Sequence, residues 1–334
     1  MIDVALDARI TARMSMGTRA YVGELLARLP SVAPELTIAR AGRGGNFGIS
    51  EQLELPRELA RLAPRLVHYP TTFAPLVRRQ PYVVTIHDLI HLRYPDLFGR
   101  PTALHYALVG GPLARGAARL LMGDPRTIED CVRFLGVPRE RCRVVPLGYD
   151  PAVLDAEPAR AARPYLFYAG NHRPHKDLAV LLAAWSALDA AVPLDLLVTG
   201  PDEPALRARY GRAGSELRFL GMLPTPDLAR TYRGALAYVH PARCEGFGIP
   251  MLEAAVAGTP VIASDGAVPA PVAPYAALFP AGDVGRLVDL LLALVADPAA
   301  ARRRAAEGVR TLRAYTWDRF AASTAAVYHE VLNG

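Results

Sequence analysis

Residues 238–264 of this 334-residue chain read YVHPARCEGFGIPMLEAAVAGTPVIAS, and this stretch is the strongest indication of the fold. Residues 236–239 are apolar and predict a short buried strand, and residues 260–263 predict the next one. Between them, Pro250 suits the first turn of a helix over residues 251–257, which Gly258 would close. The segment therefore predicts a strand, a loop, a helix and a second strand, the unit from which parallel sheets are built.

Two carboxylates stand eight residues apart in this unit, Glu245 in the loop and Glu253 in the predicted first turn of the helix. The glycines between them let the main chain approach a ligand closely, and free N–H groups at a helix start suit a phosphate or sugar oxygen. Helix-dipole preference alone would explain Glu253, but it explains neither Glu245 nor the glycines. We therefore expect a ligand site here.

A second candidate site surrounds the single lysine of the chain. Of the 38 basic residues, 37 are arginine and one is Lys176. It ends the basic loop 170–176, GNHRPHK, which follows a predicted apolar strand and precedes a helix expected to begin at Lys176 or Asp177 and to run through Trp185. Cations beside a helix N-terminus, here Arg173 and Lys176, predict a pyrophosphate site.

Strand and helix signals alternate along the whole chain, which predicts an α/β protein with parallel sheets. We expect a domain over residues 1–155, a second over 156–314 and a terminal helix over 315–334. Two such domains would meet at a cleft lined by the carboxyl ends of their strands. The predicted strands lie near residues 2–6, 66–68, 82–86, 143–145, 165–169, 194–199, 236–239 and 260–263.

Segment 238–264 resembles the E-x7-E signature of the retaining glycosyltransferase family 4, and the resemblance covers nearly the full length. It implies the GT-B fold, two Rossmann-like domains facing across a cleft. It also implies that Glu245 lies against the donor sugar and that Glu253 binds the ribose hydroxyls. Lys176 and Arg173 would neutralise the leaving nucleoside diphosphate. The resemblance places four turn residues against the sugar and pyrophosphate: Gly246, Phe247, Gly248 and Ile249.

In the first domain, residues 85–88 resemble the family's Thr-x-His-Asp, which places His87 near the donor sugar and the reacting centre. Residues 17–21 resemble the Gly-x-Gly-Arg-Tyr loop, but Arg19 stands where the second glycine would be. With Gly17, Arg19 would clamp the donor phosphate or crowd the loop, and both interpretations remain open. Ala270 replaces a family glutamate. The terminal helix, which contains Trp317, would cross back onto the first domain.

The histidines other than His87 carry weaker expectations. His68 either borders the cleft or is a core residue, and His240 is either structural or lines the site. His172 and His175 are expected at the loop surface or behind the site. No role is expected for His91, His105 or His329.

Charge and composition bear on partners. Residues 1–150 hold 20 arginines against 14 acidic residues, which accounts for the whole net charge of +6. This predicts an anionic or lipid-linked acceptor, or a peripheral contact with the inner membrane face, although a solvated arginine face is the alternative. No nucleic-acid module occurs. The absence of Asp-x-Asp predicts a metal-free site without cofactor. Three cysteines without metal-ligand spacing and no signal or membrane segment predict a cytoplasmic protein.

The predicted function is retaining hexose transfer from a nucleotide-sugar to an acceptor hydroxyl of a glycan, a lipid-linked saccharide or a small natural product. The loop 170–176 is reminiscent of mannosyl- and hexosyltransferases of polysaccharide assembly, which makes GDP-mannose the first donor candidate, ahead of UDP- and dTDP-hexoses. Same-face displacement and a covalent carboxylate intermediate both remain open. A non-catalytic GT-B subunit that binds glycan or a partner, and a sugar-nucleotide epimerase of GT-B shape, are the alternatives.

Overall fold

The chain folds into two compact units, each built on one sheet. The structure is a computed structural model that describes residues 1–9, 15–42, 50–98 and 100–334. Unit 1 comprises Met1–Gly148 and Tyr315–Gly334, and unit 2 comprises Tyr149–Ala314. Unit 2 thus begins at Tyr149, upstream of the domain boundary predicted after residue 155. It ends at Ala314, where the second domain was predicted to end.

Unit 1 contains a six-stranded sheet with the order β2-β1-β3-β4-β5-β6, and all its pairings are parallel. The first five positions follow the 2-1-3-4-5 order of flavodoxin-like doubly wound sheets. The strands are β1 Val4–Asp7, β2 Ile38–Ala41, β3 Leu66–Tyr69, β4 Tyr82–Thr85, β5 Arg119–Met122 and β6 Cys142–Val144.

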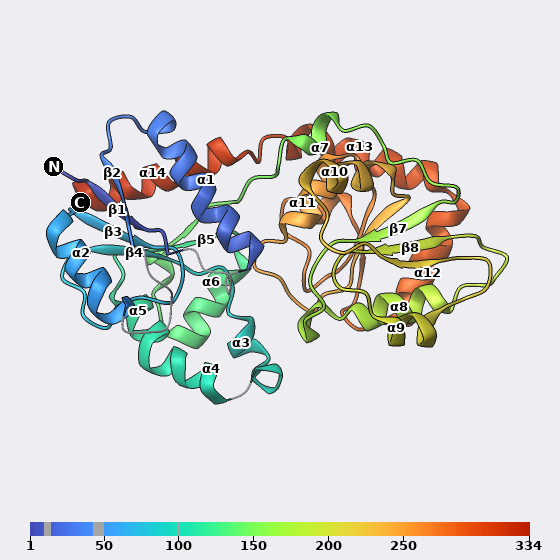
Figure 1. The fold of residues 1–334 in the computed structure, drawn as a ribbon, viewed down its shortest axis with the longest axis horizontal. Coiled ribbons are helices and arrows are strands. Elements are labelled where there is room, and N and C mark those ends of the chain that lie inside the picture. The colour runs from blue at the N-terminus through green and yellow to red at the C-terminus, as the bar shows by residue number, and fades with distance from the viewer. Residues whose placement is uncertain (10–14, 43–49, 99) are drawn as a thin grey trace. The chain divides into compact units, whose positions relative to one another are not determined.

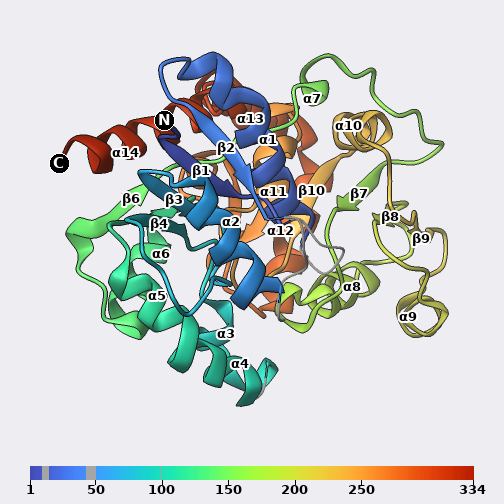
Figure 2. The ribbon, with the colours of Figure 1, turned by 60° about the vertical axis from the view of Figure 1, so that its left-hand side comes forward.

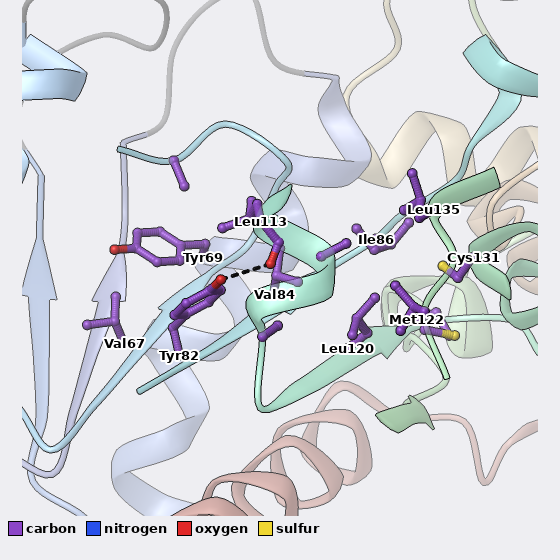
Figure 3. Packing of buried hydrophobic residues seen from close by; sticks show 14 of the residues in the cluster. Val67, Tyr69, Tyr82, Val84, Ile86, Leu113, Leu120, Met122, Cys131 and Leu135 are labelled. Carbon is purple, nitrogen blue, oxygen red and sulfur yellow. Dashed lines mark hydrogen bonds between the residues drawn. The ribbon is translucent and has the colours of Figure 1, made fainter. Parts of the chain in front are cut away.

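Helices cover this sheet, and one of its faces buries a continuous apolar cluster. Figure 3 shows part of that cluster, in which Tyr82 on β4 donates its hydroxyl hydrogen to the carbonyl oxygen of Leu113 at 3.0 Å. The buried phenol therefore meets its hydrogen-bonding need without water. The helices are α1 Met16–Val32, α2 Leu55–Leu62, α3 Ile90–Arg93, α4 Arg100–His105, α5 Gly111–Gly116, α6 Arg126–Asp130 and α14 Trp317–Asn333.

The C-terminal helix α14 belongs to unit 1, where it packs along α1 (Figures 1 and 2). Its first residue, Trp317, is buried and lies against Gly148, the last residue before unit 2. A β-carbon on Gly148 would come within 2.3 Å of the Trp317 main-chain nitrogen. Only glycine fits at this point.

Unit 2 contains a second six-stranded parallel sheet, ordered β12-β11-β10-β7-β8-β9. Counted from β7, this is the 3-2-1-4-5-6 order of the Rossmann fold. The strands are β7 Tyr165–Tyr168, β8 Asp195–Val198, β9 Leu217–Phe219, β10 Ala237–His240, β11 Val261–Ser264 and β12 Ala277–Phe279.

Helices lie on both faces of the second sheet (Figure 1). Helices α8 and α12 pack together on one face, and α10, α11 and α13 form contacts on the other. The sheet is therefore covered on both sides, as its fully buried central strands require. The helices are α7 Ala152–Asp155, α8 Leu178–Ser186, α9 Pro204–Tyr210, α10 Thr225–Gly234, α11 Ile249–Val256, α12 Val284–Ala296 and α13 Pro298–Leu312.

The α/β class with two parallel sheets is confirmed, and all eight expected strands are present. Four strands that the sequence did not predict complete the sheets: β2, β5, β9 and β12. Three of these are edge strands, and β9 and β12 have only three residues each, too few for an apolar pattern.

Candidate functional site

Helix α11 begins at the glycine-rich turn of the E-x7-E segment. It starts at Ile249 with Pro250 in its first turn, so Glu253 lies in the second turn rather than the predicted first. The turn ends at Gly248, whose φ of +79° favours glycine, and a β-carbon there would come within 2.4 Å of the Met251 side chain. The earlier helix start means that the helix dipole does not explain Glu253.

The lysine loop is also built differently from the prediction. Pro174–Lys176 form a 3-10 turn, and α8 begins only at Leu178. Between them, Asp177 adopts a left-handed conformation with φ of +49°, which is uncommon for a residue other than glycine. Lys176 therefore precedes the helix, and its side chain is held mainly by tertiary contacts.

Two loops of unit 2, residues 169–177 and 241–248, are tied to each other. The Arg243 N–H donates to the carbonyl oxygen of His175 at 2.8 Å, and Arg243 Nε donates to Asp177 Oδ2 at 2.8 Å. Lys176 Nζ, on the first loop, also donates to Glu245 Oε1 on the second. The sequence prediction that Lys176 and Glu245 belong to one site is consistent with this geometry.

Glu245 is the centre of the cluster. Its side chain is 11% exposed and that of Lys176 is 14% exposed. His240 Nε2 lies 2.7 Å from the same carboxylate oxygen, Oε1. Burial would raise the pKa of Glu245, but the Lys176 ammonium and the His240 hydrogen bond outweigh it and hold the pKa well below its usual range. Glu245 is thus a buried carboxylate that remains ionised.

His240, for which the sequence left a structural role open, touches the site directly. It ends β10, is fully buried, and its Nδ1 lies 2.8 Å from the Tyr238 hydroxyl. Burial lowers the pKa of His240, although Glu245 opposes the shift. The sequence could have indicated the contact between Tyr238 and His240, because residues two apart on a strand project from the same face of the sheet.

Glu253 has different surroundings. It is buried, and its Oε1 accepts a weak hydrogen bond from the Asp150 N–H at 3.5 Å. Burial raises the pKa of Glu253 to about 7, while the Asp150 N–H and the Tyr232 hydroxyl oppose the rise. The pKa values of the two acids of the signature are therefore shifted in opposite directions, because Lys176 and His240 lower that of Glu245 whereas burial raises that of Glu253.

The remaining residues of the predicted donor site in unit 2 differ in how far they are exposed to solvent. Gly246, Phe247 and Gly248 are buried in the turn between the two acids, and Ile249 is half-buried at the helix start. Arg173 is exposed, and its main-chain N–H donates to Asn171 Oδ1 at 3.2 Å. Within the described part of the chain, no hydrogen bond joins the Arg173 side chain to Glu245.

In unit 1, His87 follows β4 and is half-buried. Its Nε2 donates to the carbonyl oxygen of Pro70 at 2.9 Å, and its ring meets the edge of the Tyr21 ring at 5.0 Å between centroids. Burial lowers the pKa of His87, although Asp88 opposes the shift. Gly17 and Arg19 lie in the first turn of α1, where Arg19 is exposed. The loop residues 10–14 are outside the described residues.

His68 is a core residue within unit 1. Its Nδ1 lies 2.6 Å from the Tyr328 hydroxyl and its Nε2 lies 2.8 Å from Thr85 Oγ1. The Tyr21 hydroxyl is 2.7 Å from the same Thr85 oxygen. Burial lowers the pKa of His68 to about 3, so the ring is neutral. These hydrogen bonds link α14 to two strands and to α1.

A buried ionic cluster at the carboxyl end of β1 was missed by the sequence analysis. Arg9 donates to both carboxylate oxygens of Asp7, at 2.8 and 2.6 Å, and to Glu51 at 3.1 Å. Its Nη2 also donates to the Phe73 carbonyl oxygen at 3.1 Å. Gly42 packs against the Arg9 side chain with no room for a β-carbon. Arg9 thus holds three segments of unit 1 together.

The described residues provide neither a metal-binding cluster nor a membrane-spanning helix. Across residues 1–9, 15–42, 50–98 and 100–334, no group of three or more His, Cys, Asp or Glu side chains is placed to hold a metal ion. None of the helices in that part of the chain has the length and apolar character needed to cross a membrane.

Sequence comparisons identify relatives that are named as mannosyltransferases. A phosphatidyl-myo-inositol mannosyltransferase from Mycobacterium leprae is 33% identical over 198 residues, which cover 56% of this chain and 53% of that protein. An MMP alpha-(1->4)-mannosyltransferase from Mycolicibacterium hassiacum is 31% identical over 231 residues, 66% of this chain and 56% of that protein. The chain thus spans about half the length of the curated relatives it matches.

Solved structures share the fold over the full length. A sucrose-phosphate synthase from Thermosynechococcus elongatus has a TM-score of 0.74 and 20% identity and covers 100% of both chains. Anabaena HepE, solved in complex with UDP and glucose, has a TM-score of 0.74 and 15% identity, also with 100% coverage of both chains. These similarities establish the GT-B fold.

Two family profiles match consecutive parts of the sequence. The profile described as Glycosyltransferase Family 4 matches residues 18–153, and the profile described as Glycosyl transferases group 1 matches residues 163–297. The second match contains both acids of the E-x7-E segment and Lys176. The chain therefore belongs to glycosyltransferase family 4.

Proposed function

We propose that this protein is a retaining hexosyltransferase that moves a hexose from a nucleotide-sugar to an acceptor hydroxyl. The observation that carries the proposal is the largely buried Glu245–Lys176 ion pair beside the turn that begins α11. A carboxylate suits sugar hydroxyls and an ammonium suits a phosphate, and both are held next to the glycine-rich turn that precedes α11. Glu253 would accept the ribose hydroxyls.

In the proposed reaction, the bond between the sugar C1 and the donor phosphate oxygen breaks while the acceptor oxygen bonds to C1 on the same face. The acceptor proton passes to the departing phosphate. Lys176, assisted by Arg173, stabilises the negative charge that develops on that phosphate. Glu245 and His87 bind and polarise the sugar. The site would work without a metal ion or cofactor, because cations and helix N–H groups neutralise the pyrophosphate.

GDP-mannose is the first donor candidate, with UDP- and dTDP-hexoses next. The mannosyltransferase names of the mycobacterial relatives support this order, as does the O-antigen chain mannosyltransferase B of Escherichia coli, which is 23% identical over 281 residues. The UDP bound in Anabaena HepE supports a nucleoside diphosphate as the class of ligand.

The test compares donor binding and turnover. UDP, GDP, ADP and dTDP, alone and as hexose conjugates, are assayed by thermal stabilisation with and without EDTA. A ligand at a hundred times its dissociation constant adds about 2.7 kcal/mol. Stabilisation by one nucleotide, insensitive to EDTA, is expected. Conversion of the donor to another sugar nucleotide without an acceptor would favour an epimerase, and the absence of stabilisation would favour a non-catalytic subunit.

We further propose that unit 1 contacts an anionic membrane that carries the acceptor. Exposed apolar side chains come from three neighbouring segments: Leu53, Leu76, Val77, Leu104 and Leu108. The segments adjoin each other, since the Leu76 N–H donates to Gln52 at 2.9 Å and the Phe73 ring lies 4.5 Å from the His105 ring. The excess of arginine in residues 1–150 complements an anionic surface.

Co-sedimentation with vesicles tests this contact. The protein should pellet with phosphatidylglycerol vesicles and not with phosphatidylcholine vesicles, and salt should weaken the binding. The Leu104→Glu and Leu108→Glu double variant should lose binding, whereas Met222→Glu, which alters an exposed apolar residue of unit 2, should retain it. Equal binding by all three proteins would refute the contact.

A further inference from the structure

We infer that Tyr238 and His240 are positioning residues that keep Glu245 in its charged form by fixing which ring nitrogen of His240 carries hydrogen. The hydrogen-bonding part of this inference is independent of the reaction, and its catalytic consequence rests on the proposed function. The three side chains form one buried chain, from the Tyr238 hydroxyl to His240 Nδ1 at 2.8 Å and from His240 Nε2 to Glu245 Oε1 at 2.7 Å.

The position of the hydrogens follows from the chemistry of each group. An ionised carboxylate only accepts hydrogen bonds, so His240 Nε2 must carry a hydrogen and donate it to Glu245. A neutral imidazole has one N–H, so Nδ1 then presents a lone pair. The Tyr238 hydroxyl must donate to that lone pair. Neutral His240 has no other arrangement that satisfies both neighbours.

Tyr238 has a second acceptor within reach, the Ala169 carbonyl oxygen at 3.0 Å. If its single hydrogen turned to Ala169, the tyrosine oxygen would need a hydrogen from Nδ1. His240 would then present a bare Nε2 to Glu245, which is tolerable only if Glu245 is protonated. The arrangement with hydrogen on Nε2 therefore stabilises the charged form of Glu245, and Lys176 on the same oxygen favours that form as well.

The same aromatic residues connect this chain to the lysine loop. The Tyr168 ring stacks on the His240 ring with 6.0 Å between centroids, and its hydroxyl donates to the Asn171 carbonyl oxygen at 2.8 Å. Ala169 and Asn171 both belong to the loop that carries Lys176. Tyr168 and Tyr238 thus fix the position of the loop relative to His240.

The groups that face Glu245 decide its response to pH. They are Lys176, His240, Tyr168 and Tyr238, and the pKa values of both tyrosines are raised, chiefly by burial. Both phenols therefore stay neutral through the working range. Loss of the hydrogen bond from His240 would leave Lys176 as the only partner and would raise the pH at which Glu245 takes up a proton.

Nitrogen-15 NMR of the imidazole side chains tests the hydrogen-bonding part directly. In the wild-type protein at pH 7.5, the His240 signal, assigned by its loss in His240→Gln, should show a neutral ring with hydrogen on Nε2. In Glu245→Gln the amide can donate to Nε2, so the form with hydrogen on Nδ1 should appear. A doubly protonated ring, or hydrogen on Nδ1 in the wild-type protein, would overturn the inference.

Kinetics test the catalytic consequence. Tyr238→Phe should lower kcat about tenfold, since one hydrogen bond in the chain to a charged group is lost. The acid limb of the kcat–pH profile should move to higher pH, with KM for the donor nearly unchanged. His240→Gln, which can still donate to Glu245, should retain more activity than His240→Leu.

Tyr165→Phe is the matched control. It removes a buried hydroxyl from the same sheet, where Tyr165 donates to the Thr231 carbonyl oxygen at 2.9 Å. It should cost similar stability and leave the acid limb in place. An equal shift in both variants would reduce His240 to a structural residue. If the wild-type protein transfers no sugar, the proposed function fails, while the NMR result still decides the tautomer.

Discussion

Each of the two sheets carries a buried histidine on an interior strand, and each histidine is hydrogen-bonded to a tyrosine hydroxyl. His68 on β3 meets Tyr328 at 2.6 Å, and His240 on β10 meets Tyr238 at 2.8 Å. The partners of the second ring nitrogen differ, because His68 meets the Thr85 hydroxyl and His240 meets the Glu245 carboxylate. A hydroxyl both donates and accepts, whereas a carboxylate only accepts.

That difference separates a structural network from the one that we propose to be functional. The hydrogens of the His68 network can run in either direction, so the network ties elements together and fixes no charge. With Glu245 ionised and His240 neutral, the His240 chain has one direction, and it ends at an ion pair beside a helix start. Similar side chains on similar sheets can thus have different roles, which the last partner decides.

Removal of Lys176 should have the largest effect on stability and turnover. Lys176→Ala leaves Glu245 as a buried charge without a cation, so stability should fall by about 3 kcal/mol and turnover by about a thousandfold. Calorimetry and a donor-turnover assay measure the two losses. Arg230→Ala, which removes an exposed cation from the same unit, should change neither. Normal turnover in Lys176→Ala would remove the functional distinction between the two networks.

Glu253→Gln should stabilise the protein at high pH while weakening nucleotide binding. The folded pKa of Glu253 is about 7, above its ordinary value, so the folded state holds the proton more tightly and its stability falls as pH rises from 4.5 through 7. The variant should therefore gain about 3 kcal/mol at pH 8 and less than about 1 kcal/mol at pH 5. Thermal unfolding at the two pH values provides the measurement, and equal gains would show that the carboxyl is not buried.

His68 should produce the opposite pH dependence in unit 1. The unfolded chain takes up a proton at His68 near pH 6.5, but the folded chain does so only near pH 3. Stability should therefore fall as pH drops below 6.5, by about 2 kcal/mol between pH 8 and pH 5 from this residue. In His68→Gln that part of the fall should be absent. An unchanged pH dependence of the melting temperature would contradict a neutral His68.

Tyr328→Phe should have the smallest effect. It removes the α14 end of the unit 1 network and should cost about 1 kcal/mol of stability. The acid limb of the kcat–pH profile should stay where it is, in contrast to Tyr238→Phe. A shift in Tyr328→Phe would show that the unit 1 network also sets the charge of a reacting group.

Much of the fold could be predicted because parallel strands and their helices have local signals. The interior strand β5 was still missed, since its four residues begin with the charged Arg119 and leave too short an apolar run to distinguish a strand. The edge strands β2, β9 and β12 were also missed, and two of them are only three residues long. Their position depends on pairing with a neighbour rather than on their own pattern.

Candidate site residues could be proposed from the sequence, but contacts between distant residues could not. Lys176 and Glu245 were assigned to one site through resemblance, but nothing local in a pair 69 residues apart indicates a shared oxygen with His240. Arg9 and Asp7 are close in sequence, yet their burial with Glu51 became visible only in the folded unit. The helix around Glu253 begins earlier than predicted because Ile249 and Pro250 already have helical geometry.

The contact between Gly148 and Trp317 has a consequence for chain topology. The polypeptide leaves unit 1 at Gly148 and returns to it at Tyr315, and these two points adjoin within unit 1. Unit 2 is therefore an insertion into one continuous path, and excising it would interrupt that path at a single place. A short linker from residue 148 to residue 315 would restore it, which makes this junction the natural position for exchanging unit 2 for that of another protein.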